Sequence, residues 1–331
     1  MSARRHPAPR AVPAPAPAGG GTGFTPSLLP ENPDDFLHAM LGEAARFLDG
    51  HPEFKSPRAI VDLWNLFRNR SRTFELDDFG YDEVAARPWT ELFDFLYSVW
   101  WRVTLSGVDN IPMTGRALLV SNHSGVLPWD GAMVKRGIER EHAAHRTARM
   151  LVLDMFTTLP FLQPWLRHMG EVRACPENGE RLLRRDELVG VFPEGVKGVG
   201  KLFRDRYRLA RFGRGGFARL ALQTGAPVIP VTVVGAEEIH PNLARMDFIG
   251  KPLGLPYFPL TPTFPLLGPL GVLPLPTKWW IDIGKPIVFP HGPEVADRPM
   301  IVNELADQVR STLQTMIDSR LSRRGNVFTG E

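Results

Sequence analysis

The sequence predicts an α/β protein in which a mostly parallel or mixed sheet is flanked by helices and preceded by a helical section. From about residue 101 onward, short apolar runs rich in β-branched residues alternate with helical patterns. Strands that alternate with helices are typical of a largely parallel sheet. With 331 residues, 43% of them hydrophobic, the chain can bury a substantial core.

The chain divides into four predicted regions. Residues 1–30 are rich in Ala, Pro and Gly and carry no apolar stretch typical of a secretory signal, so we expect a disordered tail. Residues 31–101 place apolar side chains at helical spacing and form the helical section. Residues 102–290 form the α/β core, and residues 291–331 form a C-terminal helix and tail.

Seven apolar runs in the core region are predicted strands. They cover residues 101–107, 116–123, 149–154, 170–174, 188–192, 227–235 and 278–284. Helical patterns between them begin near Trp129, Met155, Pro176 and Gly213. Near the C-terminus one helical face carries Val302, Leu305, Val309, Leu313, Met316 and Ile317. This spacing predicts a helix that packs on the domain and closes it.

Composition argues against several classes of protein. The formal net charge is only +3, so we expect no nucleic-acid partner. A single cysteine, Cys175, excludes internal disulfides and fits a reducing compartment. The nine histidines are scattered without zinc-ligand spacing, so we expect no metal and no bound cofactor. No stretch of about 20 apolar residues predicts a membrane-spanning helix.

The stretch "SNHSGVLPWDG", residues 121–131, ends a predicted strand on His123. Ligands collect beyond the carboxyl ends of strands in open α/β sheets, and a neutral imidazole is a natural base at physiological pH. Asp130 would then orient the ring. The alternative is that His123 is a polar loop residue and Asp130 only complements the dipole of the next helix. This stretch alone leaves both interpretations open.

A second strand runs into "FPEGVKG", residues 192–198, which exposes the carboxylate of Glu194 in a turn. A run of basic residues follows, with Asp205 as its one acid: Lys197, Lys201, Arg204, Arg206, Arg208, Arg211, Arg214 and Arg219. Because the acids that would balance a solvated face are missing, the run favours an anionic partner. The same stretch imitates a phosphate-binding P-loop, but Leu202 replaces the required hydroxyl residue.

Four stretches in this order resemble the motifs of the phospholipid/glycerol acyltransferase superfamily, most of all its bacterial lysophospholipid and monoacylglycerol acyltransferase-like branch. They are "NHSGVLPWDG", "MGEVRA", "VFPEGVKG" and "APVIPVTVVG". The resemblance covers roughly residues 100–290 and implies the glycerol-phosphate acyltransferase fold. In two places the sequence departs from the family pattern. Six residues instead of the common four separate His123 from Asp130, and Lys197 stands where the family has Arg. The sequence therefore leaves the pairing of His123 with Asp130 open.

The resemblance implies transfer of a fatty acyl group from acyl-CoA or acyl carrier protein to a hydroxyl of a glycerolipid or lysophospholipid, in phospholipid or glycerolipid biosynthesis. His123 is then the general base and Asp130 its partner. Residues implied to contact the acceptor are Gly170, Arg173, Glu194, Gly195 and Lys197. Backbone N–H groups near Ser124 and Gly125 are candidates for stabilising the oxyanion. An acyl hydrolase or thioesterase, and a catalytically inactive lipid-binding homologue, are the alternatives.

Residues 254–280 are strongly apolar but broken by prolines every few residues, so they cannot form a spanning helix. Two interpretations stay open: a segment packed on the domain, or an apolar loop that enters one leaflet with Trp279 and Trp280 near the interface. The second predicts a membrane surface as partner. It also predicts a cytoplasmic protein, peripheral or monotopic, on the inner face of the membrane.

Overall fold

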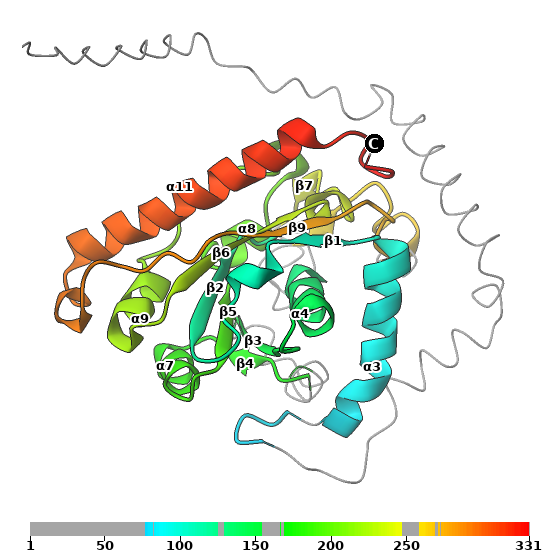
Figure 1. The fold of residues 1–331 in the computed structure, drawn as a ribbon. Coiled ribbons are helices and arrows are strands. Elements are labelled where there is room, and N and C mark those ends of the chain that lie inside the picture. Colours follow the sequence, from blue (N-terminus) through cyan, green and yellow to red (C-terminus); the bar gives the residue numbers. More distant parts are fainter. Residues whose placement is uncertain are drawn as a thin grey trace, which may run out of the picture.

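The computed structural model describes residues 77–81, 83–124, 129–153, 166, 169–246, 258–268, 271 and 273–330. The predicted tail, the first part of the helical section and the helix predicted near Met155 lie outside these residues. The described residues form a mixed sheet between two layers of helices (Figure 1).

Seven strands make up the main sheet, and each overlaps one of the predicted runs. Their order is β1 (Thr104–Ser106), β9 (Trp280–Ile283), β6 (Val228–Val234), β2 (Ala117–Ser121), β5 (Leu188–Val191), β3 (Ala148–Val152) and β4 (Val172–Arg173). The strands from β6 to β4 are parallel, whereas β9 pairs antiparallel with β6 and parallel with β1. The predicted mixed α/β sheet is confirmed.

Helices cover both faces of this sheet (Figure 1). One face packs against α3 (Glu83–Phe95), the π-helical turn Leu96–Trp100 and α4 (Trp129–Glu141). The other packs against α7 (Pro176–Arg184), α9 (Gly216–Thr224) and α11 (Pro299–Arg323). The shorter elements are the 3₁₀ turns Val108–Asn110, Phe203–Asp205, Ala236–Glu238 and Pro293–Val295, the helical turn α8 (Val196–Val199), and the paired strands β7 (Ala244–Arg245) and β8 (Pro259–Leu260).

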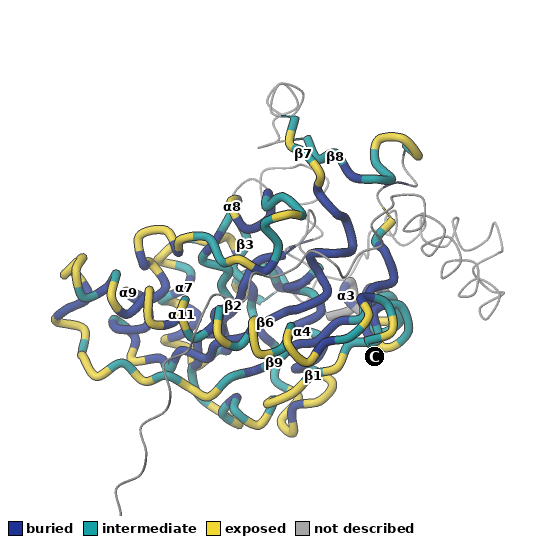
Figure 2. The backbone as a smooth tube through the Cα atoms, turned by 90° about the horizontal axis from the view of Figure 1, so that it is seen from above, coloured by how far each residue is buried: buried dark blue, intermediate teal, exposed yellow. Residues whose placement is uncertain are grey.

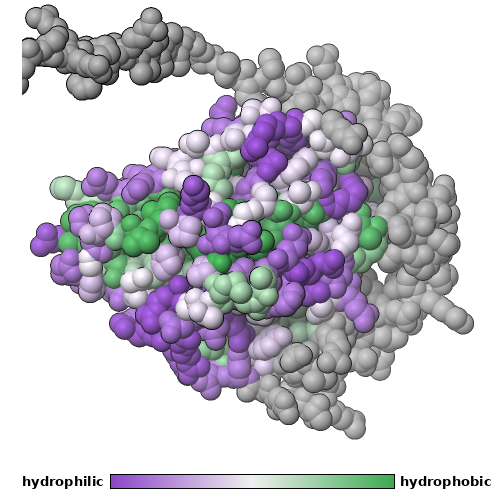
Figure 3. Space-filling model, viewed as in Figure 1, coloured by the Kyte–Doolittle hydropathy of each residue, from purple (hydrophilic) through white to green (hydrophobic). Residues whose placement is uncertain are grey.

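The central strand β2 is buried on both faces. Leu119 belongs to the core beneath α3 and α4, whereas Leu118 and Val120 belong to the core beneath α9 and α11. A parallel strand covered on both faces carries a continuous apolar sequence, which is why this run was easy to predict. On the outer surface, Figure 3 shows apolar residues gathered in a band between hydrophilic regions.

The C-terminal helix α11 lies as predicted. Of the six apolar residues predicted on one face, all but the half-buried Met316 are buried in the domain: Val302, Leu305, Val309, Leu313 and Ile317. Pro299 stands at its start, where the missing N–H has no helical partner to lose.

Candidate active site

His123 lies two residues beyond β2, at the carboxyl edge of the sheet. The chain leaves the β2–β6 ladder at Asn122, whose side chain takes over the pairing. Its Nδ2 donates to the carbonyl of Val233 at 3.0 Å, and its Oδ1 accepts the N–H of the same residue at 2.8 Å. This side chain fixes where the strand ends and therefore where His123 begins.

His123 and Asp130 form a buried pair. Asp130, in the first turn of α4, places Oδ2 2.7 Å from Nδ1 of His123. The carboxylate also accepts the N–H of Ser124 at 2.8 Å and, through Oδ1, its neighbour Gly131 at 2.9 Å. Because a carboxylate only accepts, the hydrogen of this contact lies on Nδ1, and in the neutral ring the lone pair is then on Nε2. This is the protonation pattern of a general base.

A cavity of about 630 Å³ opens beside the imidazole. It extends from α3 and α4 across the ends of the strands to α9. Its apolar lining includes Trp89, Phe93, Met150, Phe192, Phe217 and Leu220. The rings of His123 and Phe192 lie 4.6 Å apart at a tilt of 32°. A lining of this kind suits a long hydrocarbon chain.

One part of the cavity wall is charged. Lys135 of α4 lies 3.6 Å from Glu171 and donates to the carbonyl of Met169. Burial raises the pKa of Glu171 to about 7, against the opposing effect of Lys135. Gly170 lies behind these groups with φ +80°, and an added Cβ would come within 2.6 Å of the Arg149 guanidinium. Gly170 therefore packs against Arg149, and its neighbour Glu171 faces the cavity.

The five residues predicted to contact an acceptor lie in different places. Gly195 lines the cavity, whereas Gly170, Arg173 and Lys197 are not among its lining residues. The side chains of Arg173 and Lys197 are exposed. Glu194 is also absent from the lining, because its oxygens accept backbone N–H groups of His123 and Ala210 at 3.1 and 2.7 Å. The contact of Glu194 with an acceptor therefore stays a prediction that the cavity lining does not support.

The predicted oxyanion donors receive no support from the geometry. The N–H of Ser124 donates to Asp130, so its role toward an oxyanion stays a prediction without support from the geometry. Gly125 lies outside the described residues. Ser124 Oγ is buried without a hydrogen-bond partner in the structure.

Part of the basic run is paired with acids elsewhere in the chain. Lys201 lies 3.4 Å from Glu194 and 3.2 Å from Glu237, and Arg219 lies 3.0 Å from Asp297. The sequence could not show this, because the acids follow other strands and helices. For these two residues the inference of an anionic partner from missing acids loses its basis, whereas Arg214 is exposed at the cavity.

The predicted membrane contact through Trp279 and Trp280 is wrong. Trp279 is 0% exposed and stacks on Trp101 with ring centroids 4.4 Å apart. Its indole N–H donates to Thr277 at 3.0 Å. Trp280 belongs to a buried cluster with Ile317 of α11. Because residue 280 begins β9, both rings pack inside the domain.

Several residues at the site carried no clear signal in the sequence. Lys135 and Glu171 appear there as ordinary surface charges, and Glu237 follows a strand without any motif. Cys175 is half-buried and lines the cavity. Within the described ranges, no group of acidic, His and Cys side chains could hold a metal ion. No helix in the same ranges is long and apolar enough to cross a membrane.

The chain matches one family model and is similar to several known proteins. Residues 102–234 match the family model described as Acyltransferase. An uncharacterised protein of Mycobacterium tuberculosis is 47% identical over 262 residues, which cover 78% of this chain and 72% of that protein. A chicken protein described as a DGAT1/2-independent enzyme synthesizing storage lipids is 27% identical, with 80% of this chain and 74% of the relative covered. Among solved structures, the 1-acyl-sn-glycerophosphate acyltransferase PlsC of Thermotoga maritima matches 87% of this chain and 98% of its own, at 17% identity and a TM-score of 0.48.

Proposed function

Because the chain belongs to the phospholipid/glycerolipid acyltransferase superfamily, we propose that it transfers a fatty acyl group from acyl-CoA or acyl carrier protein to a hydroxyl of a glycerolipid or lysophospholipid. The observation that carries this proposal is the buried His123–Asp130 pair, with His123 at the wall of an apolar cavity. The description of the chicken relative as an enzyme synthesizing storage lipids supports a glycerolipid as acceptor.

The proposed reaction needs one base. Nε2 of His123 takes the proton of the acceptor hydroxyl as its oxygen attacks the thioester carbonyl, and Asp130 stabilises the imidazolium that forms. The tetrahedral intermediate then collapses: the C–S bond breaks, the ester remains, and the imidazolium returns its proton to the departing sulfur. A thiol has a pKa of about 8.5 and is a good leaving group, so the step needs no covalent acyl-enzyme.

The charges of the cavity wall favour an acceptor with a neutral head over a phosphorylated one. Lys135 is paired with Glu171, and Arg136 is paired with Asp94 at 2.7 Å. A phosphate beside Lys135 would compete with Glu171 for the same ammonium group, and the ionised form of Glu171, whose pKa is about 7, would repel it. Arg214, which lines the α9 end of the cavity and is exposed, is the better candidate to meet a donor phosphate.

We place the proposed membrane contact on leucines near β7 and β8. Leu266 is 82% exposed, and Leu243, Leu267 and Leu273 are each more than half exposed. Figure 2 shows β7 and β8 standing off from the body of the protein, with an exposed loop after β8. Exposed Arg245 on β7 would add attraction to anionic lipid. These features support a peripheral membrane protein, and we propose the cytoplasmic face as its location.

An acceptor panel tests the proposed function. Purified protein receives radiolabelled acyl-CoA with monoacylglycerol, diacylglycerol, lysophosphatidate or another lysophospholipid, and the esterified product is separated. We expect acceptor-dependent product with wild type and almost none with a folded His123→Ala variant. Release of free thiol at the same rate with and without an acceptor would favour a hydrolase. Binding of acyl-CoA without any turnover would favour an inactive lipid-binding protein.

A further inference from the structure

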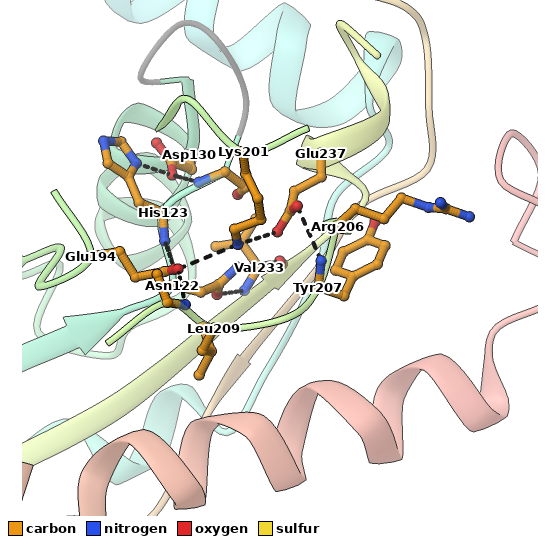
Figure 4. Close-up of polar contacts among 12 residues, drawn as sticks. Asn122, His123, Asp130, Glu194, Lys201, Arg206, Tyr207, Leu209, Val233 and Glu237 are labelled. Carbon is orange, nitrogen blue, oxygen red and sulfur yellow. Dashed lines mark hydrogen bonds and ion pairs between the residues drawn. The ribbon is translucent and has the colours of Figure 1, made fainter. Parts of the chain in front are cut away.

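The main chain of His123 is held from the side opposite Asp130 by a buried carboxylate. Oε1 of Glu194 accepts the N–H of His123 at 3.1 Å, and Oε2 accepts the N–H of Ala210 at 2.7 Å. The side chain of Glu194 is 0% exposed. Asp130 therefore fixes the ring of His123, while Glu194 fixes the backbone from which the ring extends (Figure 4).

Glu194 is balanced by one cation, which it shares with a second carboxylate. Lys201 Nζ lies 3.4 Å from Glu194 Oε2 and 3.2 Å from Glu237 Oε1, and its side chain is 8% exposed. Figure 4 shows the ammonium group between the two acids. Burial lowers the pKa of Lys201, but the two carboxylates outweigh it and raise the pKa above its ordinary value. Lys201 is therefore a cation between two acids, and all three side chains are buried away from water.

The far side of this cluster is anchored in the fold. Oε2 of Glu237 accepts the N–H of Tyr207 at 3.1 Å, and the Tyr207 hydroxyl accepts a bond from Arg324, just after α11, at 2.9 Å. On the near side, Gly198 packs closely against both Glu194 and His123, since an added Cβ would lie 2.8 Å from the Cβ atoms of both. Because Glu194 also accepts the N–H of His123, we expect a shift of Glu194 to disturb His123.

We propose that Lys201 is a positioning residue for the acyl transfer: anchored by Glu237, it holds the Glu194 carboxylate against the N–H of His123 and so keeps Nε2 at the cavity. This inference rests on the proposed function. Removal of the buried ammonium leaves Glu194 and Glu237 without their shared cation. The two acids then either repel each other as carboxylates or take up a proton, since burial already raises the pKa of Glu237 to about 7. Glu194 then moves, and a displacement of about 1 Å at a catalytic group is enough to slow a reaction on the order of 100-fold.

The test compares Lys201→Met with a matched control. Asp282 and Arg320 form another mostly buried ion pair, with a 2.7 Å contact, between β9 and α11. We expect Lys201→Met to lower kcat by about 10- to 100-fold with little change in KM, and Asp282→Asn to lose stability while keeping kcat within about twofold. Equal losses in the two variants, or a Lys201→Met effect confined to KM, would overturn the inference.

A charge-specific rescue separates positioning from simple loss of packing. In Lys201→Met the cluster holds two carboxyl groups without a cation, and adding Glu237→Gln makes one of them permanently uncharged while an amide oxygen remains for the N–H of Tyr207. We expect the double variant to regain part of kcat. If Lys201→Met acts only by leaving a cavity, Glu237→Gln does not fill that cavity and kcat should not recover. A double variant slower than Lys201→Met therefore counts against the proposal.

A readout independent of activity keeps the inference separate from the proposed function. Amide hydrogen exchange of the segment 117–124 reports the His123 N–H that Glu194 accepts. We expect faster exchange of this segment in Lys201→Met and unchanged exchange in Asp282→Asn. If wild type transfers acyl groups to no acceptor, the proposed function fails, and exchange alone decides whether Lys201 holds His123. Unchanged exchange in folded Lys201→Met would then refute it.

Discussion

Replacement of Asp130 by asparagine tests the dyad with the smallest change in shape. The carboxylate receives hydrogens from Nδ1 of His123 and from the N–H groups of Ser124 and Gly131, at 2.7, 2.8 and 2.9 Å. An amide has one accepting oxygen. If that oxygen faces His123, the NH₂ group meets the N–H of Gly131, and an unpaired buried donor costs about 1–3 kcal/mol.

If the amide turns, the NH₂ group faces His123, which must then accept at Nδ1 and carry its hydrogen on Nε2. The base is lost in this arrangement, and general-base catalysis contributes about 10²- to 10⁴-fold. We expect Asp130→Asn to lower kcat by this factor, or about 3–5 kcal/mol of transition-state stabilisation. KM for acyl-CoA should change little, because the cavity lining stays in place.

The assay is steady-state acyl transfer by four folded proteins: wild type, His123→Ala, Asp130→Asn and the double variant. Groups that act as one unit are strongly non-additive, so the double variant should be no slower than His123→Ala alone. Circular dichroism establishes that each variant is folded. The reasoning fails if Asp130→Asn keeps kcat within about threefold of wild type, or if the two single effects add.

Three further predictions concern the cavity and the surface. Alkylation of Cys175, the only cysteine of the chain, should be slowed by long-chain acyl-CoA because the thiol lines the cavity, and a maleimide rate that ignores acyl-CoA would contradict this. Leu266→Asp with Leu267→Asp should weaken liposome flotation, whereas Val288→Asp, at an equally exposed site, should not; an equal loss in both would remove the membrane assignment. Burial raises the pKa of Glu171 from 4.5 to about 7, so the native state keeps a proton that the unfolded chain releases. Wild type should therefore lose stability relative to Glu171→Gln as pH rises from 5 to 8, by at most on the order of 3 kcal/mol in urea unfolding, and parallel curves would contradict it.

The sequence predicted those features that depend on local pattern. Strand β2 is apolar throughout because both its faces are covered, and His123 was placed correctly at its carboxyl end. The role of Glu194 could not be obtained in this way. Its partners Lys201 and Ala210 come from the chain that follows α8, and no periodicity encodes which carboxylate a lysine will meet in space. The predicted membrane contact of Trp279 was wrong for a similar reason, because its stacking partner Trp101 is distant in sequence.

The unusual spacing of the dyad has a structural explanation in how Asp130 is held. Its carboxylate accepts the N–H of Ser124, directly after His123, and the N–H of Gly131, directly after Asp130 itself. The geometry of the pair is therefore fixed at the two ends of the intervening segment, and the number of residues between them does not set the 2.7 Å contact. The sequence must supply an acid in the first turn of α4, where the helix dipole favours a carboxylate. A count of residues from His123 is thus a weaker criterion for this dyad than the position of the acid on α4.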